Sequence, residues 1–178
     1  RELCNEAGGV QDQIAVAFGG FNRIDFSADG YQVTPVVMSN ERKEILNDNL
    51  MMFFTGFSRF SSDIQTSTQA VLKDKTAQLL EMYSLVDTAQ GILTDKNSDL
   101  NDFGRLLDHT WKLKRGITTR ISTNSLDEIY EKAMSAGALG GKLLGAGGGG
   151  FFVFYVEPEK RKSVMQALDK LLYIPFRF

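Results

Sequence analysis

Residues 138–156 read ALGGKLLGAGGGGFFVFYV, and this stretch decides the fold of the chain. Two short apolar runs, 138–144 and 151–156, flank a glycine-rich loop, and each run is typical of a buried strand. Eight of the 17 glycines of the chain lie between Gly137 and Gly150. Each glycine costs about 0.5–1 kcal/mol relative to alanine in regular structure, so we expect this loop to need a bare backbone.

The residues alone leave two explanations of the loop open. Its N–H groups approach a phosphate closely, or the glycines serve a tight hairpin that binds no ligand. Gly145, Gly147 and Gly150 have the G-x-G-x-x-G spacing, but a dinucleotide-binding loop leads into a helix, whereas a strand follows here. Lys142 precedes the glycines and no Gly-Lys-Ser/Thr occurs, which excludes a P-loop. Whether Lys142 faces a site stays open.

Elements are predicted outward from this loop by apolar spacing and by breaker residues. Helices are expected at 10–18, within 79–93 and 100–111, from a capping box at Ser125 and Glu128 to Gly137, and at 158–172. Strands are expected at 21–26 and 31–38, with a turn at Asp29-Gly30, and at 50–55 and 173–178. Residues 39–49 read as a charged link, and Pro175 confines the last strand to a sheet edge. This order predicts an α+β fold in which helices cover a mostly antiparallel sheet.

Composition narrows the class of protein. The chain has 178 residues, of which 43% are hydrophobic and 24% charged, as in ordinary globular domains. Cys4 is the single cysteine, so no internal disulfide forms, and we expect a reducing, cytoplasmic compartment. A formal charge of −2 gives no footprint for nucleic acid, and the longest apolar run is too short for a membrane span. Because the first residue is Arg1, we expect an N-terminal portion to precede it.

The segment GGKLLGAGGGGF at 140–151 resembles the C-terminal glycine motif of the GHMP sugar and metabolite kinases. The segments at 9–13 (GVQDQ) and 15–21 are similar to the part of these kinases that bears the catalytic aspartate. Similarity to the sugar-phosphate branch lies in TGFSR at 55–59, SDI at 62–64, WKLKR at 111–115 and IS at 121–122. Within the family, the resemblance is strongest to D-glycero-D-manno-heptose 7-phosphate kinases, followed by L-fucokinase-like enzymes.

The resemblance implies two parts. Residues 1–38, a helix and a β-hairpin, would be a remnant of the family's N-terminal domain, and residues 39–178 would be its ferredoxin-like C-terminal domain. The N-terminal half, with the main loop that wraps the ATP phosphates, is absent from these residues. We therefore expect the segment alone to be inactive, and the missing half to be its partner.

The resemblance also implies a reaction: ATP-dependent phosphorylation of a sugar phosphate, in the biosynthesis of lipopolysaccharide or capsule sugars. Asp12 would orient and deprotonate the anomeric hydroxyl of heptose 7-phosphate, giving the 1,7-bisphosphate. ATP and Mg²⁺ are the expected cofactors, and no metal ligand is assigned in this chain. The residues expected to contact the nucleotide are Gly145, Ala146, Gly147, Gly148, Gly149 and Gly150. The residues expected to bind the sugar phosphate are Arg59, Lys112 and Arg115.

Each assignment has a plainer alternative. Asp12 is also a common type of carboxylate at a helix N-terminus, and Asp108 with Lys112 fits an i, i+4 pair on a solvated face. His109, the single histidine, has no Cys or His at ligand spacing, so we expect no metal site there. For the protein as a whole, the alternatives are a non-catalytic binding or regulatory module of the same fold and a structural piece that forms a homodimer.

Overall fold

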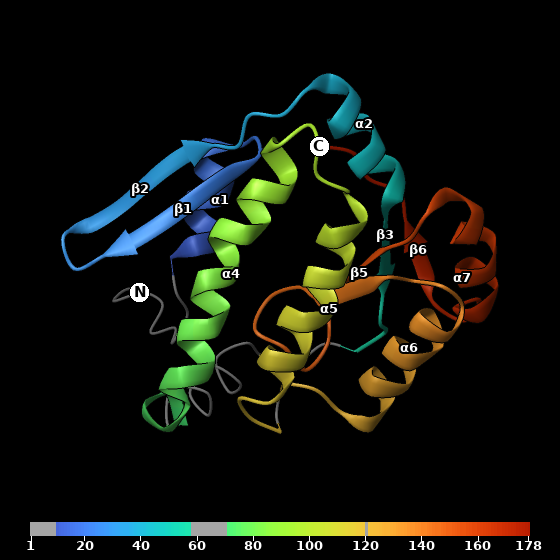
Figure 1. Ribbon diagram of the computed structural model, residues 1–178. Coiled ribbons are helices and arrows are strands. Elements are labelled where there is room, and N and C mark those ends of the chain that lie inside the picture. The colour runs from blue at the N-terminus through green and yellow to red at the C-terminus, as the bar shows by residue number, and fades with distance from the viewer. Residues whose placement is uncertain (1–9, 58–70, 120) are drawn as a thin grey trace.

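The computed structural model describes residues 10–57, 71–119 and 121–178 of the chain. Helices and antiparallel strands form an α+β fold, as the sequence predicts, with a four-stranded sheet and a separate two-stranded hairpin (Figure 1). The predictions for Arg59, for residues 1–9 and for residues 62–64 lie outside the described residues. Within the described ranges, no helix is both long enough and apolar enough to cross a bilayer.

The N-terminal part consists of α1 (Gln11–Phe18), β1 (Asn22–Ser27) and β2 (Gly30–Pro35). The strands pair antiparallel, with Ser27 opposite Gly30, so the two turn residues are Ala28 and Asp29. The predicted turn at Asp29-Gly30 is therefore wrong by one residue. The Oγ atom of Ser27 accepts a hydrogen bond from the N–H of Asp29 at 3.2 Å, which holds the chain reversal one position earlier.

The main sheet contains β3 (Leu50–Phe54), β4 (Gly140–Leu143), β5 (Phe151–Tyr155) and β6 (Leu172–Ile174). Its order is β4-β5-β3-β6, and all neighbouring strands are antiparallel. The two helical crossovers, β3 to β4 and β5 to β6, each pass over one intervening strand, which is the ferredoxin-like arrangement. The last strand lies at the edge, as predicted, but ends at Ile174, because Pro175 has no N–H to donate.

The helices are α2 (Asn40–Asn49), α4 (Thr76–Thr94, after the 3₁₀ turn η1 at Leu72–Lys75), α5 (Asn101–Arg115), α6 (Asn124–Ser135) and α7 (Arg161–Ala167, after η2 at Pro158–Lys160). The prediction of a link at 39–49 is wrong, since α2 occupies it. The Oγ of Ser39 caps α2 by accepting from the N–H of Arg42 at 3.2 Å. The buried guanidinium of Arg42 donates to the carbonyl oxygens of Ile92, Leu93 and Ser98, at the end of α4. A cap, the contacts of one cation and a single buried apolar residue, Leu46, thus hold this helix, which has no apolar stripe.

Two helix boundaries also differ from the prediction. The N-cap of α6 is Thr123, whose Oγ1 accepts from the N–H of Leu126 at 3.4 Å, so the capping box predicted at Ser125 is wrong. Leu126 is completely buried and fixes the rotation of this helix. The predicted helix 158–172 ends at Ala167, because Leu172 pairs with Phe54 in the sheet.

Two apolar clusters fill the molecule, one on each face of the sheet. The larger contains Phe152 and Phe154, whose ring centroids lie 5.2 Å apart, and Trp111 of α5, which meets Phe152 edge-on at 5.6 Å. Helices α6 and α7, strands β3 and β4, and residues of the connecting segments supply the rest of this cluster. On the other face, Tyr155 packs with residues of α2, α4 and the start of α5. Helix α5 lies against β4, and α4 lies beside α5 (Figure 1).

Glycine allows α5 and β4 to approach closely. A Cβ atom on Gly140 would lie 1.9 Å from the carbonyl oxygen of Gly104 in α5. A side chain at this point of the strand would push the helix away. The contact sets the position of everything that α5 carries relative to the start of the glycine loop.

Candidate functional site

The glycine loop, residues 145–150, connects β4 to β5. Where the loop leaves the sheet, the N–H of Leu144 donates to the carbonyl oxygen of Phe151 at 2.8 Å. All five glycines of the loop have positive φ, between +73° and +154°. L-residues rarely adopt this region, so the backbone conformation explains the glycine content.

Hydrogen bonds fix the far side of the loop to two neighbouring segments. The N–H of Gly148 donates to the carbonyl oxygen of Ile121 at 2.9 Å, and the N–H of Gly150 donates to that of Phe57 at 2.8 Å. The carbonyl oxygen of Gly150 accepts from the N–H of Thr55 at 2.9 Å. The loop is therefore held in one shape.

Two of the glycines are also required by close packing. A Cβ on Gly147 would lie 2.9 Å from the carbonyl oxygen of Ile121, and one on Gly149 would lie 2.5 Å from that of Phe57. At Gly145, by contrast, an added Cβ would meet nothing within 4 Å. The first residue of the loop is thus open, whereas its middle is packed.

Four N–H groups of the loop have no partner among the described residues: those of Gly145, Ala146, Gly147 and Gly149. Successive unpaired N–H groups in a turn form a concavity that favours an anion. The loop therefore offers donors as well as a bare backbone.

Lys114, in the last turn of α5, contacts the start of this loop. Its Nζ donates to the carbonyl oxygen of Gly145 at 2.6 Å. Burial, and to a smaller extent the positive charge of Lys142, lower the pKa of Lys114 to about 8, although the negative charge of Asp12 opposes both effects. The three charged groups are therefore close enough to influence one another.

Asp12 lies in the first turn of α1 and is exposed. One of its carboxylate oxygens accepts a hydrogen bond from the Nε2 of Gln11 at 3.3 Å. Its charge acts on Lys114, which in turn contacts Gly145. The structure thus brings Asp12 and the first residue of the glycine loop to the same region, although 133 positions separate them in the sequence.

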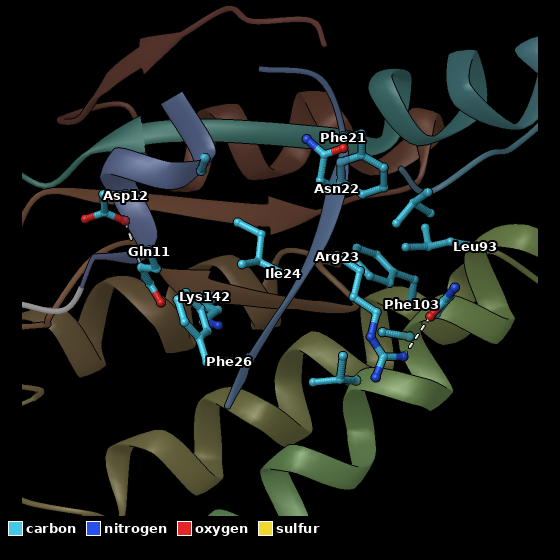
Figure 2. A pocket seen from close by; sticks show the side chains of 15 residues that line it. Gln11, Asp12, Phe21, Asn22, Arg23, Ile24, Phe26, Leu93, Phe103 and Lys142 are labelled. Carbon is cyan, nitrogen blue, oxygen red and sulfur yellow. Dashed lines mark hydrogen bonds between the residues drawn. The ribbon is translucent and has the colours of Figure 1, made fainter. Parts of the chain in front are cut away.

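A cavity of about 500 Å³, here called the hairpin cavity, opens beside Asp12. Its walls come from α1, the β1–β2 hairpin, α4, α5 and one residue of β4, Lys142. Gln11, Asp12 and Lys142 lie at one end, and Arg23 lies at the other (Figure 2). The rest of the lining is mostly apolar and includes Ile24 and Phe103.

The Arg23 end of the hairpin cavity is occupied by carboxylates. The guanidinium of Arg23 bonds to both carboxylate oxygens of Asp25, at 2.8 and 2.9 Å. It also bonds to Asp87 at 2.5 Å and to Gln90 at 2.8 Å, both on α4. Two carboxylates around one cation make this end net negative, so it disfavours a phosphate.

Two of the residues expected to bind the sugar phosphate have partners within the chain. The Nζ of Lys112 lies 2.7 Å from Asp108, which also accepts from the hydroxyl of Tyr130 at 2.8 Å. Arg115 pairs with Asp127 at 3.0 Å. Neither lines the hairpin cavity. The third, Arg59, lies outside the described residues.

Among the described residues, Lys114 and Lys142 are cations near Asp12, and the sequence predicted a role for neither. A signal was present for Lys114, because Leu107, Trp111 and Lys114 follow the i, i+4, i+7 spacing of one helix face. Trp111 on that face is buried, whereas the side chain of Lys112 is largely exposed. For Lys142, the signal was the alternation of side chains along β4, which places Lys142 on the opposite face of the strand from the buried Leu143.

No metal site is present in the described part of the chain. Its His, Cys, Asp and Glu residues form no group of three or more that could hold an ion. His109 bonds through Nε2 to Glu81 at 2.8 Å on the exposed faces of α5 and α4. No metal ligand is therefore assigned among the described residues.

Residues 89–174 match the sequence pattern of the family described as "GHMP kinases C terminal". This segment of the chain is a GHMP kinase C-terminal domain. The fold agrees, since the crystal structure of L. major mevalonate kinase in complex with R-mevalonate superimposes with a TM-score of 0.70 at 20% identity. That superposition covers 94% of this chain and 53% of the mevalonate kinase.

Sugar kinases of the same family are also similar to this chain. The D-glycero-alpha-D-manno-heptose 7-phosphate kinase of Campylobacter jejuni is 32% identical over 172 residues, which cover 96% of this chain and 50% of that protein. A D-glycero-D-manno-heptose 1-phosphate kinase structure from Bacteroides thetaiotaomicron has a TM-score of 0.56 at 28% identity, covering 96% of this chain and 46% of that one. This chain thus spans about half the length of the Campylobacter jejuni kinase.

Proposed function

We propose that the full-length protein is an ATP-dependent sugar kinase that phosphorylates the anomeric hydroxyl of D-glycero-D-manno-heptose 7-phosphate to give the 1,7-bisphosphate. The similarity to a heptose 7-phosphate kinase supports the choice of substrate. One structural observation carries the proposal: the charge of Asp12 acts on Lys114, whose ammonium group bonds to the open first residue of the glycine loop. A general base and a set of phosphate-binding donors are what a phosphoryl transfer to a hydroxyl needs in one place.

In this proposal, Asp12 acts on the attacking hydroxyl. Its exposed carboxylate accepts the proton of the sugar hydroxyl as the oxygen attacks the terminal phosphorus of ATP. Gln11 donates to one carboxylate oxygen, so the other is free to face the sugar. Gln11 thereby orients the carboxylate of Asp12 toward the sugar hydroxyl.

The glycine loop binds the nucleotide phosphates in this proposal. The unpaired N–H groups of residues 145–147 and 149 donate to phosphate oxygens, and the open space around Gly145 lets them come close. Anchoring at Gly148 and Gly150 keeps these donors in place, so little order is lost when the ligand binds. When bound with ATP, Mg²⁺ would neutralise part of the phosphate charge.

For the phosphate of the sugar, Arg59, Lys112 and Arg115 remain candidates. Binding a phosphate through Lys112 requires it to leave Asp108, and binding through Arg115 requires it to leave Asp127. Such an exchange of partners would reduce the affinity gained from either residue.

We also propose that residues 1–38 belong to the N-terminal domain of the whole kinase. The hairpin forms a sheet of its own, separate from the ferredoxin-like sheet, which supports this division. The remaining half of the enzyme would then supply the main ATP loop. An ATP-consuming enzyme with one cysteine also fits a cytoplasmic location.

The test is turnover by the purified full-length gene product. ADP formation is measured with D-glycero-D-manno-heptose 7-phosphate and, separately, with L-fucose. We expect turnover with the heptose phosphate, and a loss of about 10²- to 10⁴-fold in the Asp12→Asn variant with ATP binding retained. Turnover with fucose alone would identify an L-fucokinase-like enzyme. Normal ATP binding without turnover of any sugar would instead identify a regulatory module.

A further inference from the structure

Lys142 carries a charge in unusually apolar surroundings. It lies on β4 opposite Val153 and lines both the hairpin cavity and an adjoining cavity of about 230 Å³. The neighbours that α5 contributes there are Phe103 and Leu107. No described residue forms a hydrogen bond or an ion pair with its ammonium group. A half-buried cation without a partner is costly, and an anionic ligand would offset this cost.

Lys114 reaches the same region from α5. One of its three N–H bonds is directed to the carbonyl oxygen of Gly145. This contact holds the ammonium beside the unpaired N–H groups of the loop, and it leaves two N–H bonds for another acceptor. The Nζ of Lys114 is thus fixed at the mouth of the loop.

The two ammonium groups repel each other. Burial lowers the pKa of Lys142, and burial together with Lys142 lowers that of Lys114, whereas Asp12 is the carboxylate that opposes this effect. Two cations and one carboxylate leave a net positive charge at this end of the hairpin cavity. A dianion placed between the lysines would relieve their repulsion.

The other cations near the site differ in one respect. Arg23, Lys112 and Arg115 each hold a carboxylate within 3.0 Å. Neither Lys114 nor Lys142 forms such an ion pair with a described residue. Among the described residues, the cations near this site without a carboxylate partner are therefore Lys142, at the end of the hairpin cavity that also holds Asp12 (Figure 2), and Lys114, beside the start of the glycine loop.

We propose that Lys114 and Lys142, the lysine pair, bind a phosphate group between the glycine loop and Asp12. The inference rests on the proposed kinase function and extends it, because it assigns a phosphate-binding role to two residues outside the predicted set. The phosphate is either the terminal phosphate of the nucleotide or the one that the sugar already carries. In both cases the ligand is a phosphate dianion that receives N–H donors from the lysine pair and from the loop.

The proposal is tested in the full-length gene product by measuring how tightly each ligand binds when no phosphate is transferred. The variants Lys114→Met and Lys142→Met remove each charge and keep the length of the side chain, and Lys162→Met, at an exposed position of α7, is the matched control. Calorimetry measures the affinity for a non-hydrolysable ATP analogue and, in a separate titration, for the sugar phosphate. We expect each lysine-pair variant to weaken one of these ligands by about 10- to 100-fold, and the control to weaken neither.

The ligand that weakens identifies the source of the phosphate, the nucleotide or the sugar. A second measurement needs no variant that might be unstable: ¹³C-methylated lysines of the unmutated protein are followed by NMR while inorganic phosphate is added. We expect the resonance with a pKa near 8 to shift and its pKa to rise, because a bound anion favours the charged amine.

The proposal would be overturned if the lysine-pair variants bound both ligands with unchanged affinity. It would also be overturned if the lysine resonance with a pKa near 8 did not shift when phosphate is added. Failure of the proposed function has a different signature. If the protein binds phosphate through the lysine pair but transfers none to any sugar, the kinase assignment fails while the binding site stands.

Discussion

The Nζ of Lys114 donates a hydrogen bond of 2.6 Å to the carbonyl oxygen of Gly145, and this bond joins the end of α5 to the start of the glycine loop. Residues 31 positions apart are thereby held together at the open side of the loop. The amine sits where burial and Lys142 both disfavour its charge. Its protonation is consequently linked to the stability of the folded state.

The first prediction concerns pH. Lys114 has a pKa of about 8 in the folded protein and about 10.5 when unfolded. Between these values the unfolded chain binds the additional proton, so the free energy of unfolding rises with pH from about 8 to 10.5 through this group. Urea unfolding at several pH values should show this rise in the unmutated protein and a smaller rise in Lys114→Met.

Lys142, whose pKa burial also lowers, contributes in the same direction, and Asp12 opposes the effect on Lys114. The comparison between the unmutated protein and Lys114→Met isolates the first group. Parallel curves for the two proteins over this pH range would contradict the prediction. Lys162→Met should follow the unmutated curve.

The second prediction separates packing from conformation in the glycine loop. At Gly145, alanine meets open space and bears only the cost of positive φ, about 1–2 kcal/mol. At Gly149, alanine also meets the carbonyl oxygen of Phe57 at 2.5 Å, so we expect a loss of about 2–5 kcal/mol. Chemical denaturation of the two variants measures the difference. Equal destabilisation would mean that the loop can move away from Phe57.

The third prediction compares two Gly→Ala substitutions that should change the free energy of unfolding in opposite directions. In Gly140→Ala, the Cβ would overlap the backbone at Gly104, and we expect a loss of about 3 kcal/mol or more because α5 must move from β4. In Gly91→Ala, the new methyl group on α4 meets nothing within 4 Å, and alanine should stabilise the helix by about 0.5–1 kcal/mol. Thermal unfolding checks both. A stable Gly140→Ala variant would show that the contact is adjustable.

The fourth prediction concerns the connection between α2 and α4. Arg42→Met removes the donors from the carbonyl oxygens at the end of α4 and should cost about 2–4 kcal/mol, since those buried oxygens lose their partner. Arg105, which is exposed and pairs with Asp102, provides the matched control. Arg105→Met should change the free energy of unfolding by less than about 1 kcal/mol. Similar losses in both variants would contradict this view of Arg42.

Much of the fold could be predicted from local pattern. The glycine loop between two apolar runs predicted the β4–β5 hairpin, and Gly137 marked the end of α6. Helix α2 could not be predicted in this way, because its stability comes from Arg42 reaching the end of α4, a contact between residues about 50 positions apart. The N-cap of α6 was misplaced because two hydroxyl residues, Thr123 and Ser125, compete for the same role.

The site was harder to predict than the fold. Pattern and resemblance selected Asp12 and the glycine loop, and the structure brings these two together. Among the basic residues at the end of α5, however, spacing alone did not identify the one that faces the loop. That choice depends on how α5 is rotated against β4, which is set by tertiary packing of Trp111 and Gly104. The role proposed for Lys142 depends on the hairpin cavity, which forms only when distant segments of the chain pack together.

The contact between Gly104 and Gly140 fixes the position of α5 relative to β4, and with it the positions of Lys114 and Lys142. Lys114 follows Gly104 by ten residues, about 15 Å along the helix axis, and Lys142 follows Gly140 by two residues on the same side of the strand. Inserting one residue between Gly104 and Lys114 would turn the amine by about 100° away from the loop while leaving every side chain chemically intact. The spacing of residues along α5 is therefore as much a part of the site as their identity.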